Sequence, residues 1–196
     1  MAILYVASDQ NSAGKTAVCA AIASDLSKSG KRVAVIKLSM GVARGSEDPD
    51  VGLYQGTLGN QILVESLSLA KKSLTKDSVE KFKNDADEII KDRDILIIEG
   101  SASITPKNAA KLSDSVNARV LFVSKYDPNL DGNSLSKICR AFGDSLIGIL
   151  VNGLTRYRSS EVKTKLIPGM ESSDLKLLGI IPEDRRLLSV SVSQIA

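Results

Sequence analysis

The sequence predicts an α/β fold, a three-layer αβα sandwich with a mostly parallel sheet. Short and almost continuously apolar segments recur along the 196 residues, and they alternate with longer amphipathic segments. Continuous apolar character is typical of strands that helices cover on both faces. The alternation predicts βαβ units, and the length suits one domain with a full core. Residues 1–196 are therefore interpreted as a single domain.

The individual elements are predicted from these two patterns. The apolar segments predict strands at residues 2–7, 32–36, 94–98, 119–123, 146–151 and 177–181. Apolar side chains at helical spacing predict helices at residues 16–26, 78–91 and 133–142. Cys139 falls on the apolar face of the last helix, so we interpret it as a core residue, with a reactive thiol as the alternative. Residues 39–59 are the least regular stretch, and we expect a functional loop that is mobile in the free protein.

The composition excludes several kinds of chemistry. The chain has no histidine, which removes Ser-His-Asp and Cys-His nucleophile systems and histidine-ligated metals. Its cysteines, Cys19 and Cys139, form no CxxC pair and cannot make a four-thiolate zinc site. The net charge of +3 gives no reason to expect nucleic acid or a membrane as a partner. No apolar run reaches the ~18 residues of a membrane span and no charged signal-peptide start is present, so we expect a cytoplasmic protein.

A candidate phosphate-binding loop is the strongest chemical signal. The residues Ser8-Asp-Gln-Asn-Ser-Ala-Gly-Lys-Thr16 follow the first strand and open the first helix. Successive backbone N–H groups and the helix N-terminus direct partial positive charge at phosphate oxygens. Lys15 would bridge the terminal phosphates of a triphosphate, and the Thr16 hydroxyl would ligate Mg²⁺. The predicted binding residues of the loop are Ser12, Ala13, Gly14, Lys15, Thr16 and Ala17.

This loop departs from the usual GxxxxGK[ST] pattern at its start. The pattern would place glycine at Asp9, and a loop one residue longer would place it at Ser8. The alternative is an ordinary turn between strand and helix in which Gly-Lys-Thr occurs by chance. The flanking strand and helix favour the phosphate-binding interpretation.

With this loop, the chain resembles the dethiobiotin synthetase family of P-loop proteins, whose longer loop also ends in Gly-Lys-Thr and whose second strand ends in lysine. Residues 118–127, 143–152 and 178–192 are similar to the dethiobiotin-synthetase-like N-terminal domain of phosphotransacetylase-family proteins. The resemblance covers essentially the whole chain. It implies a P-loop NTPase fold, ATP and Mg²⁺ as cofactors, and the N-terminal part of a longer protein or a short family member. Because the synthetases complete their sites across a two-fold interface, it also implies a homodimer.

The resemblance implies roles for side chains at the ends of two strands. Lys37, together with Lys15, would be catalytic and would face the phosphates and the substrate. Glu99 would support Mg²⁺ with Thr16, and a carboxylate at this edge of a parallel sheet points into the crevice where ligands bind. The alternatives are a solvated strand-end lysine for Lys37 and a surface residue that caps its strand for Glu99.

The resemblance also implies a third metal ligand and contacts to the nucleotide base. Asp50 would complete the Mg²⁺ ligands, with Asp48 as a competitor and a solvated acidic loop as the alternative. Asn152 would hydrogen-bond the purine, although Asn-Gly is equally a turn signal. Pro182 and Glu183 would lie near the same base, or would form only a rigid turn.

Two departures from the synthetases bear on function. Leu38 follows Lys37 where a Lys-Pro pair is expected, and residues 99–106 carry hydroxyls in place of a glycine-rich segment. We favour a Mg·ATP-binding regulatory module that senses nucleotide for an attached domain. The reason is that residues suited to binding phosphate are present, whereas residues that would bind a second substrate are not recognisable. The alternatives are an ADP-forming ligase that activates a small carboxylate or amino acid, and a scaffold that has lost nucleotide binding.

Overall fold

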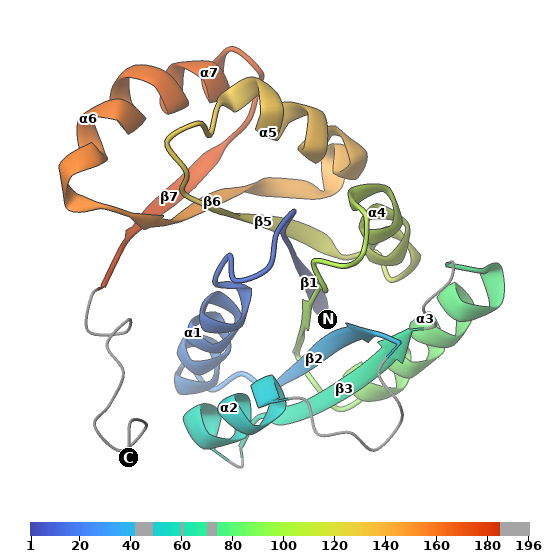
Figure 1. Cartoon of the computed structure of the whole chain (residues 1–196). Coiled ribbons are helices and arrows are strands. Elements are labelled where there is room, and N and C mark those ends of the chain that lie inside the picture. The colour runs from blue at the N-terminus through green and yellow to red at the C-terminus, as the bar shows by residue number, and fades with distance from the viewer. Residues whose placement is uncertain (42–48, 60, 70–73, 185–196) are drawn as a thin grey trace.

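One parallel sheet forms the centre of the fold. The computed structural model describes residues 1–41, 49–59, 61–69 and 74–184, and within them the sheet has seven strands in the order β3-β2-β4-β1-β5-β6-β7 (Figure 1). The strands are β1 (Ala2–Ala7), β2 (Val33–Met40), β3 (Leu63–Leu69), β4 (Ile95–Glu99), β5 (Arg119–Lys125), β6 (Leu146–Leu154) and β7 (Leu177–Pro182). All neighbouring strands are parallel.

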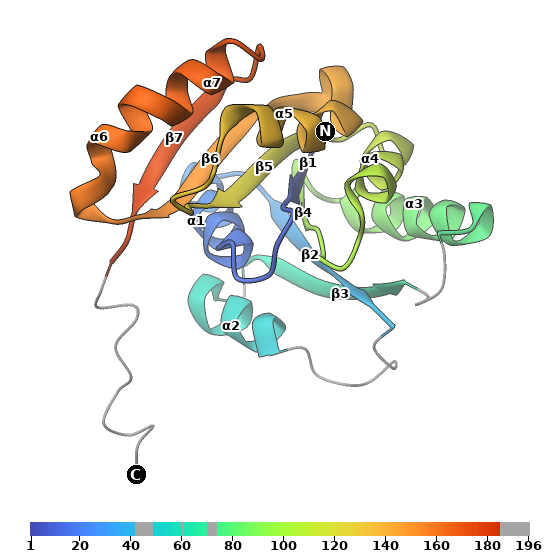
Figure 2. The same cartoon turned by 45° about the horizontal axis from the view of Figure 1, so that its top comes forward.

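Helices cover both faces of this sheet and complete the three predicted layers (Figure 2). The first face carries α1 (Lys15–Lys28) and α2 (Pro49–Leu58). The second face carries α3 (Lys76–Ile90), α4 (Pro106–Ser115), α5 (Gly132–Cys139), η1 (Arg140–Ser145), η2 (Arg156–Arg158), α6 (Ser159–Glu161), η3 (Val162–Leu166) and α7 (Ile167–Glu171). The predicted fold class is confirmed.

The central strands explain the continuous apolar segments of the sequence. Residues 33–36 of β2 and 96–98 of β4 are completely buried, because successive side chains enter the separate hydrophobic clusters on the two faces. Cys139 is also buried, in the cluster on the second face, so its predicted place in the core is confirmed. None of the helices in the described ranges combines the length and apolar character that a membrane span requires.

Strand β3 is missing from the predicted elements. It lies at one edge of the sheet and pairs with β2 alone. Its sequence, LVESLSL, includes exposed polar side chains such as Glu65 and Ser66, so it lacks the continuous apolar character of the central strands. An edge strand can carry exposed polar side chains, and those of β3 interrupt the apolar segment on which the prediction depends. The other edge strand, β7, keeps the apolar sequence LLGII and is among the predicted strands.

The interpretation of residues 39–59 as an irregular loop is wrong for its second half. Residues 49–58 form α2, which begins at Pro49, a residue favoured at the first position of a helix. Among the α2 side chains that the structure describes, Tyr54 alone is buried, and this explains why no helical periodicity is visible. Residues 42–48 lie outside the described part of the chain, so the expected mobility of this stretch stays a prediction.

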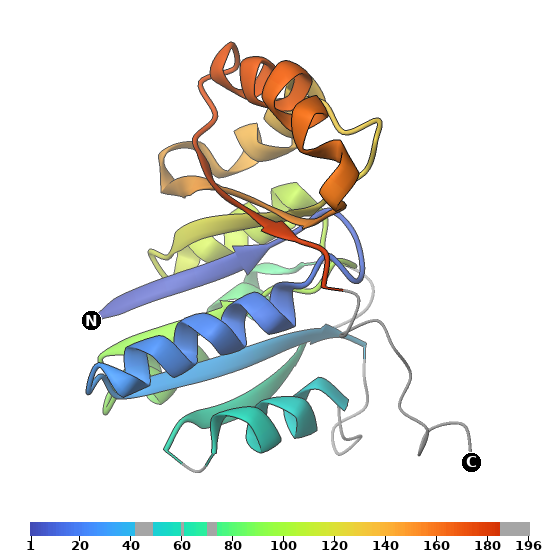
Figure 3. The same cartoon turned by 90° about the vertical axis from the view of Figure 1, so that its left-hand side faces the viewer.

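The carboxyl ends of the strands meet at a single edge of the sheet, where α1 also begins (Figure 3). In the register of the central strands, Val6 pairs with Glu99 and Glu99 pairs with Lys37. Ligands of open parallel sheets bind at this edge.

Candidate nucleotide-binding site

The loop between β1 and α1 is closed by two unusual backbone positions and one distant side chain. Ser12 and Gly14 both have positive φ, of 55° and 92°. Asn152, at the end of β6, donates a hydrogen bond of 2.9 Å from Nδ2 to the carbonyl oxygen of Ala13. A Cβ atom on Gly14 would collide with the same amide group. Gly14 is therefore required both by its backbone conformation and by the close approach of Asn152.

The start of α1 is suited to an anion. Gly14 caps the helix without a side-chain hydrogen bond, and the first turn contains no acidic residue. Lys15 lies back across the loop, with Nζ 2.8 Å from Oγ of Ser8, which itself donates to the carbonyl oxygen of Gln10 at 2.9 Å. The loop thus places a buried ammonium group beside backbone N–H groups at a helix N-terminus.

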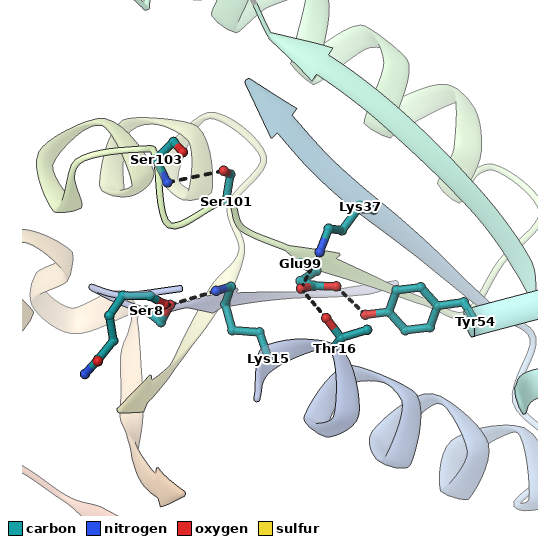
Figure 4. Close-up of polar contacts among 9 residues, drawn as sticks. Ser8, Lys15, Thr16, Lys37, Tyr54, Glu99, Ser101 and Ser103 are labelled. Carbon is teal, nitrogen blue, oxygen red and sulfur yellow. Dashed lines mark hydrogen bonds and ion pairs between the residues drawn. The ribbon is translucent and has the colours of Figure 1, made fainter. Parts of the chain in front are cut away.

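Glu99 is the centre of the polar contacts at the strand ends (Figure 4). It is 1% exposed, and three side chains donate to its carboxylate. Oε1 accepts from Thr16 Oγ1 and from Lys37 Nζ, both at 2.8 Å. Oε2 accepts from the Tyr54 hydroxyl at 2.6 Å. A buried carboxylate with a charged partner and two hydroxyl donors is well compensated for its loss of solvent.

The sheet register explains why these groups meet. Lys37 and Glu99 are paired residues on the adjacent strands β2 and β4, so their side chains leave the sheet on the same face. This is the face that α1 and α2 cover. Thr16 reaches Glu99 from the first turn of α1, and Tyr54 reaches it from α2.

Burial keeps the nearby phenol and thiol groups protonated. It raises the pKa of Tyr54 far above its ordinary value, with further increases from the neighbouring Cys19 and Glu99. Burial likewise raises the pKa of the Cys19 thiol, and the charge of Glu99 adds to the effect. Tyr54 therefore stays protonated near neutral pH and donates its hydrogen bond to Glu99.

A cavity of about 370 Å³ opens between the loop and the strand ends. It is lined by residues 11–16, Lys37, Leu38 and residues 99–102. The structure therefore brings together Ser12, Ala13, Gly14, Lys15, Thr16, Lys37 and Glu99, all of which the sequence singled out. Ala17 is exposed in the first turn of α1, outside this lining.

The residues around the cavity suit a magnesium ion that is shared with a phosphate. Within the described ranges, no group of three or more acidic, histidine or cysteine side chains could hold a metal by itself. Thr16 and Glu99 supply two oxygen ligands that lie 2.8 Å apart. Mg²⁺ is commonly held by one or two protein oxygens together with substrate phosphates, so this pair fits the ion.

The other predicted ligands are not among the described residues that line the cavity. Asp50 is the second residue of α2 and its side chain lies outside the described part of the structure, as does the whole of Asp48. The Asn152 amide contacts the loop backbone. Pro182 ends β7, and the backbone N–H of Glu183 donates to Leu154 at 2.9 Å. Contacts of Asn152, Pro182 and Glu183 with a base therefore stay predictions.

Tyr54 is the residue of this site that sequence reasoning missed. It is the only aromatic residue in the stretch 39–59, and that was the one available signal. No spacing rule connects it with Glu99, which follows 45 residues later. The loop pattern identifies Ser8 only as the start of the loop and does not predict its contact with Lys15.

The chain is similar to known nucleotide-binding proteins. The family model for the CobQ/CobB/MinD/ParA nucleotide binding domain matches residues 4–194. An uncharacterized ATP-binding protein of Methanocaldococcus jannaschii is 28% identical over 201 residues, which cover 92% of this chain and 74% of that protein.

Solved structures share the fold at low sequence identity. The MinD cell division protein of Aquifex aeolicus has a TM-score of 0.64 at 14% identity, with 96% of this chain and 84% of that chain covered. A nucleotide-binding protein of Archaeoglobus fulgidus in complex with ADP has a TM-score of 0.56 at 16% identity, with 95% and 83% covered.

Proposed function

Because the chain belongs to the family of CobQ/CobB/MinD/ParA nucleotide-binding domains, we propose that it binds ATP together with Mg²⁺ in the cavity at the phosphate loop. The observation that carries the proposal is the convergence of Lys15, Thr16, Lys37 and Glu99 on one cavity of about 370 Å³. The ATP-binding name of the Methanocaldococcus jannaschii relative supports the choice of nucleotide.

Each of these residues has a definite task in the proposed complex. Lys15 exchanges its contact with Ser8 for phosphate oxygens, and the N–H groups of the loop bind the same phosphates. Thr16 and Glu99 hold Mg²⁺, which when bound neutralises phosphate charge. Lys37, which pairs with Glu99, adds a second positive charge to the cavity lining.

The finer proposal is a nucleotide-sensing regulatory module of a phosphotransacetylase-family protein. The resemblance of residues 118–127, 143–152 and 178–192 to the N-terminal domain of those proteins supports it. The sequence also contains residues suited to binding phosphate, but no recognisable residues for binding a second substrate. We also propose a homodimer. The resemblance to the synthetases, which complete their sites across a two-fold interface, supports it.

A carboxylate-activating, ADP-forming ligase of the dethiobiotin synthetase type is the second candidate. It is favoured by the extension of the cavity beyond the phosphate loop to Lys37, Leu38 and residues 100–102, which leaves room for a small acceptor. Such chemistry needs mainly positioning and charge neutralisation, which these lysines and Mg²⁺ can supply. Release of ADP that depends on a carboxylate or on an amino acid with CO₂ would establish this candidate over the sensor.

Calorimetric titration with Mg·ATP tests the proposal. We expect binding by the parent protein and at least about tenfold weaker binding by Lys15→Ala, because a charge-assisted contact to phosphate is lost. Lys28→Ala is the matched control, since Lys28 is exposed in the last turn of the same helix. Absence of binding by the parent protein would contradict the proposal and favour a scaffold without nucleotide. Undiminished binding by Lys15→Ala would show that the loop is not the site.

A further inference from the structure

The contact between Tyr54 and Glu99 has no role in the proposal above. Tyr54 is completely buried, and its hydroxyl lies 2.6 Å from Oε2 of Glu99. The two residues come from α2 and β4, elements that are not consecutive in the sequence. Figure 4 shows the phenol approaching the carboxylate from the side opposite to Lys15.

The two oxygens of Glu99 have different partners. Oε1 accepts from Thr16 and Lys37, whereas Oε2 accepts from Tyr54. An ion held between Thr16 and Glu99 would displace donors from Oε1, because a cation and a hydrogen cannot share the same lone pair. Tyr54 donates to Oε2, which such an ion would leave untouched, so this hydrogen bond can persist when the ion is present.

We propose that Tyr54 is a positioning residue, which holds Glu99 so that Oε1 faces Thr16 and the magnesium ion. This inference rests on the proposed Mg·ATP site. Partners that orient a metal ligand from outside the ligand set contribute strongly to affinity, and their loss costs 10–100-fold in metal binding, roughly. The contact also joins α2 to the site, so an ion that fixes the Glu99 carboxylate would restrain this helix as well.

A purely structural role for Tyr54 makes a different prediction. Its ring packs in the hydrophobic cluster on the α1 face, which includes Cys19, Ala23 and Val35. If packing were its whole contribution, the ring would suffice and the hydroxyl would be dispensable. Tyr54→Phe separates the two roles because it keeps the ring and removes only the hydroxyl.

The test measures how much Mg²⁺ strengthens ATP binding. Calorimetry with ATP in magnesium chloride and again in EDTA yields a ratio of dissociation constants for each variant. We expect Tyr54→Phe to reduce this magnesium enhancement about tenfold, with little change of the affinity in EDTA. Tyr5→Phe is the matched control: Tyr5 is equally buried, on the opposite face of the sheet, and its hydroxyl has no hydrogen-bond partner within the described residues.

An unchanged enhancement in Tyr54→Phe would overturn the inference while leaving Mg·ATP binding intact. A parent protein that binds no Mg·ATP would overturn the proposed function as well. Hydrogen exchange of the parent protein provides a measurement that does not depend on the variant folding. We expect slower exchange in residues 51–58 with Mg·ATP than with ATP in EDTA, and identical exchange would also overturn the inference.

Discussion

The Thr16 hydroxyl and the Glu99 carboxylate meet at 2.8 Å although 83 residues separate them in the sequence. The parallel sheet produces this contact, because β1 and β4 are neighbours and both end at the edge where α1 begins. The phosphate loop and Glu99, the only carboxylate among the described residues that line the cavity, are therefore parts of one site.

Replacement of Gly14 by alanine should weaken both the fold and nucleotide binding. The positive φ of 92° costs an L-residue about 1 kcal/mol, and the new Cβ would also collide with Asn152. Gly30→Ala is the control, because Gly30 has a φ of 80° but open space around its Cβ position. Urea unfolding should show the larger loss of stability for Gly14→Ala, and calorimetry should show lost Mg·ATP binding only there. Equal effects of the two variants would contradict the role of the Asn152 contact.

Glu99→Gln should lower stability and remove the effect of magnesium on ATP binding. The amide keeps the shape of the side chain, but the largely buried ion pair between Lys37 and Glu99 is lost. We expect the free energy of unfolding to fall by about 1–3 kcal/mol. Exposed Glu88 of α3 provides the control variant Glu88→Gln. Full magnesium enhancement in Glu99→Gln would exclude Glu99 as a metal ligand.

The Asp94–Arg32 pair should make stability depend on pH in the acid range. Hydrogen bonds from the side chain and backbone of Arg32 lower the pKa of Asp94 from 3.8 to about 2. A carboxyl whose pKa is lower in the folded state stabilises the protein above its unfolded pKa, and this contribution is lost as pH falls through the folded pKa. Urea unfolding should therefore show a difference between the parent protein and Asp94→Asn that shrinks as pH falls from 4 to 2. A difference that is independent of pH would contradict the ion pair.

Both cysteines should be unreactive in the native protein. Cys19 and Cys139 are buried, and burial raises the pKa of the Cys139 thiol to about 12, so little thiolate is present near neutral pH. We expect no reaction with Ellman's reagent in the native state and reaction of both thiols in concentrated guanidinium chloride. Rapid reaction of one native thiol would restore the alternative of a reactive cysteine.

Local pattern was enough to identify most of the fold. The strands buried on both faces are continuous apolar segments, and the predicted 2–7 strand coincides with β1. The pattern failed at β3, whose apolar segment is interrupted by polar residues, and at α2, in which Tyr54 is the buried residue among the described side chains. It left α4 and the helical segments of residues 156–171 unpredicted as well. It also extended the 133–142 helix beyond Cys139, where the chain continues as the 3₁₀ segment η1. Periodicity reports burial, so elements with little burial leave a weak signal.

The phosphate loop and the fold class were visible in the sequence because they depend on residues that are close together along the chain. The partners of Glu99 were decided only by the tertiary structure. Lys37 pairs with it through the register of β2 and β4, and Tyr54 reaches it because α2 packs on the same face as α1. Asn152 likewise contacts Ala13 across 139 residues. Such contacts depend on strand order and helix packing, which bring distant residues to one edge of the sheet without any fixed spacing between them.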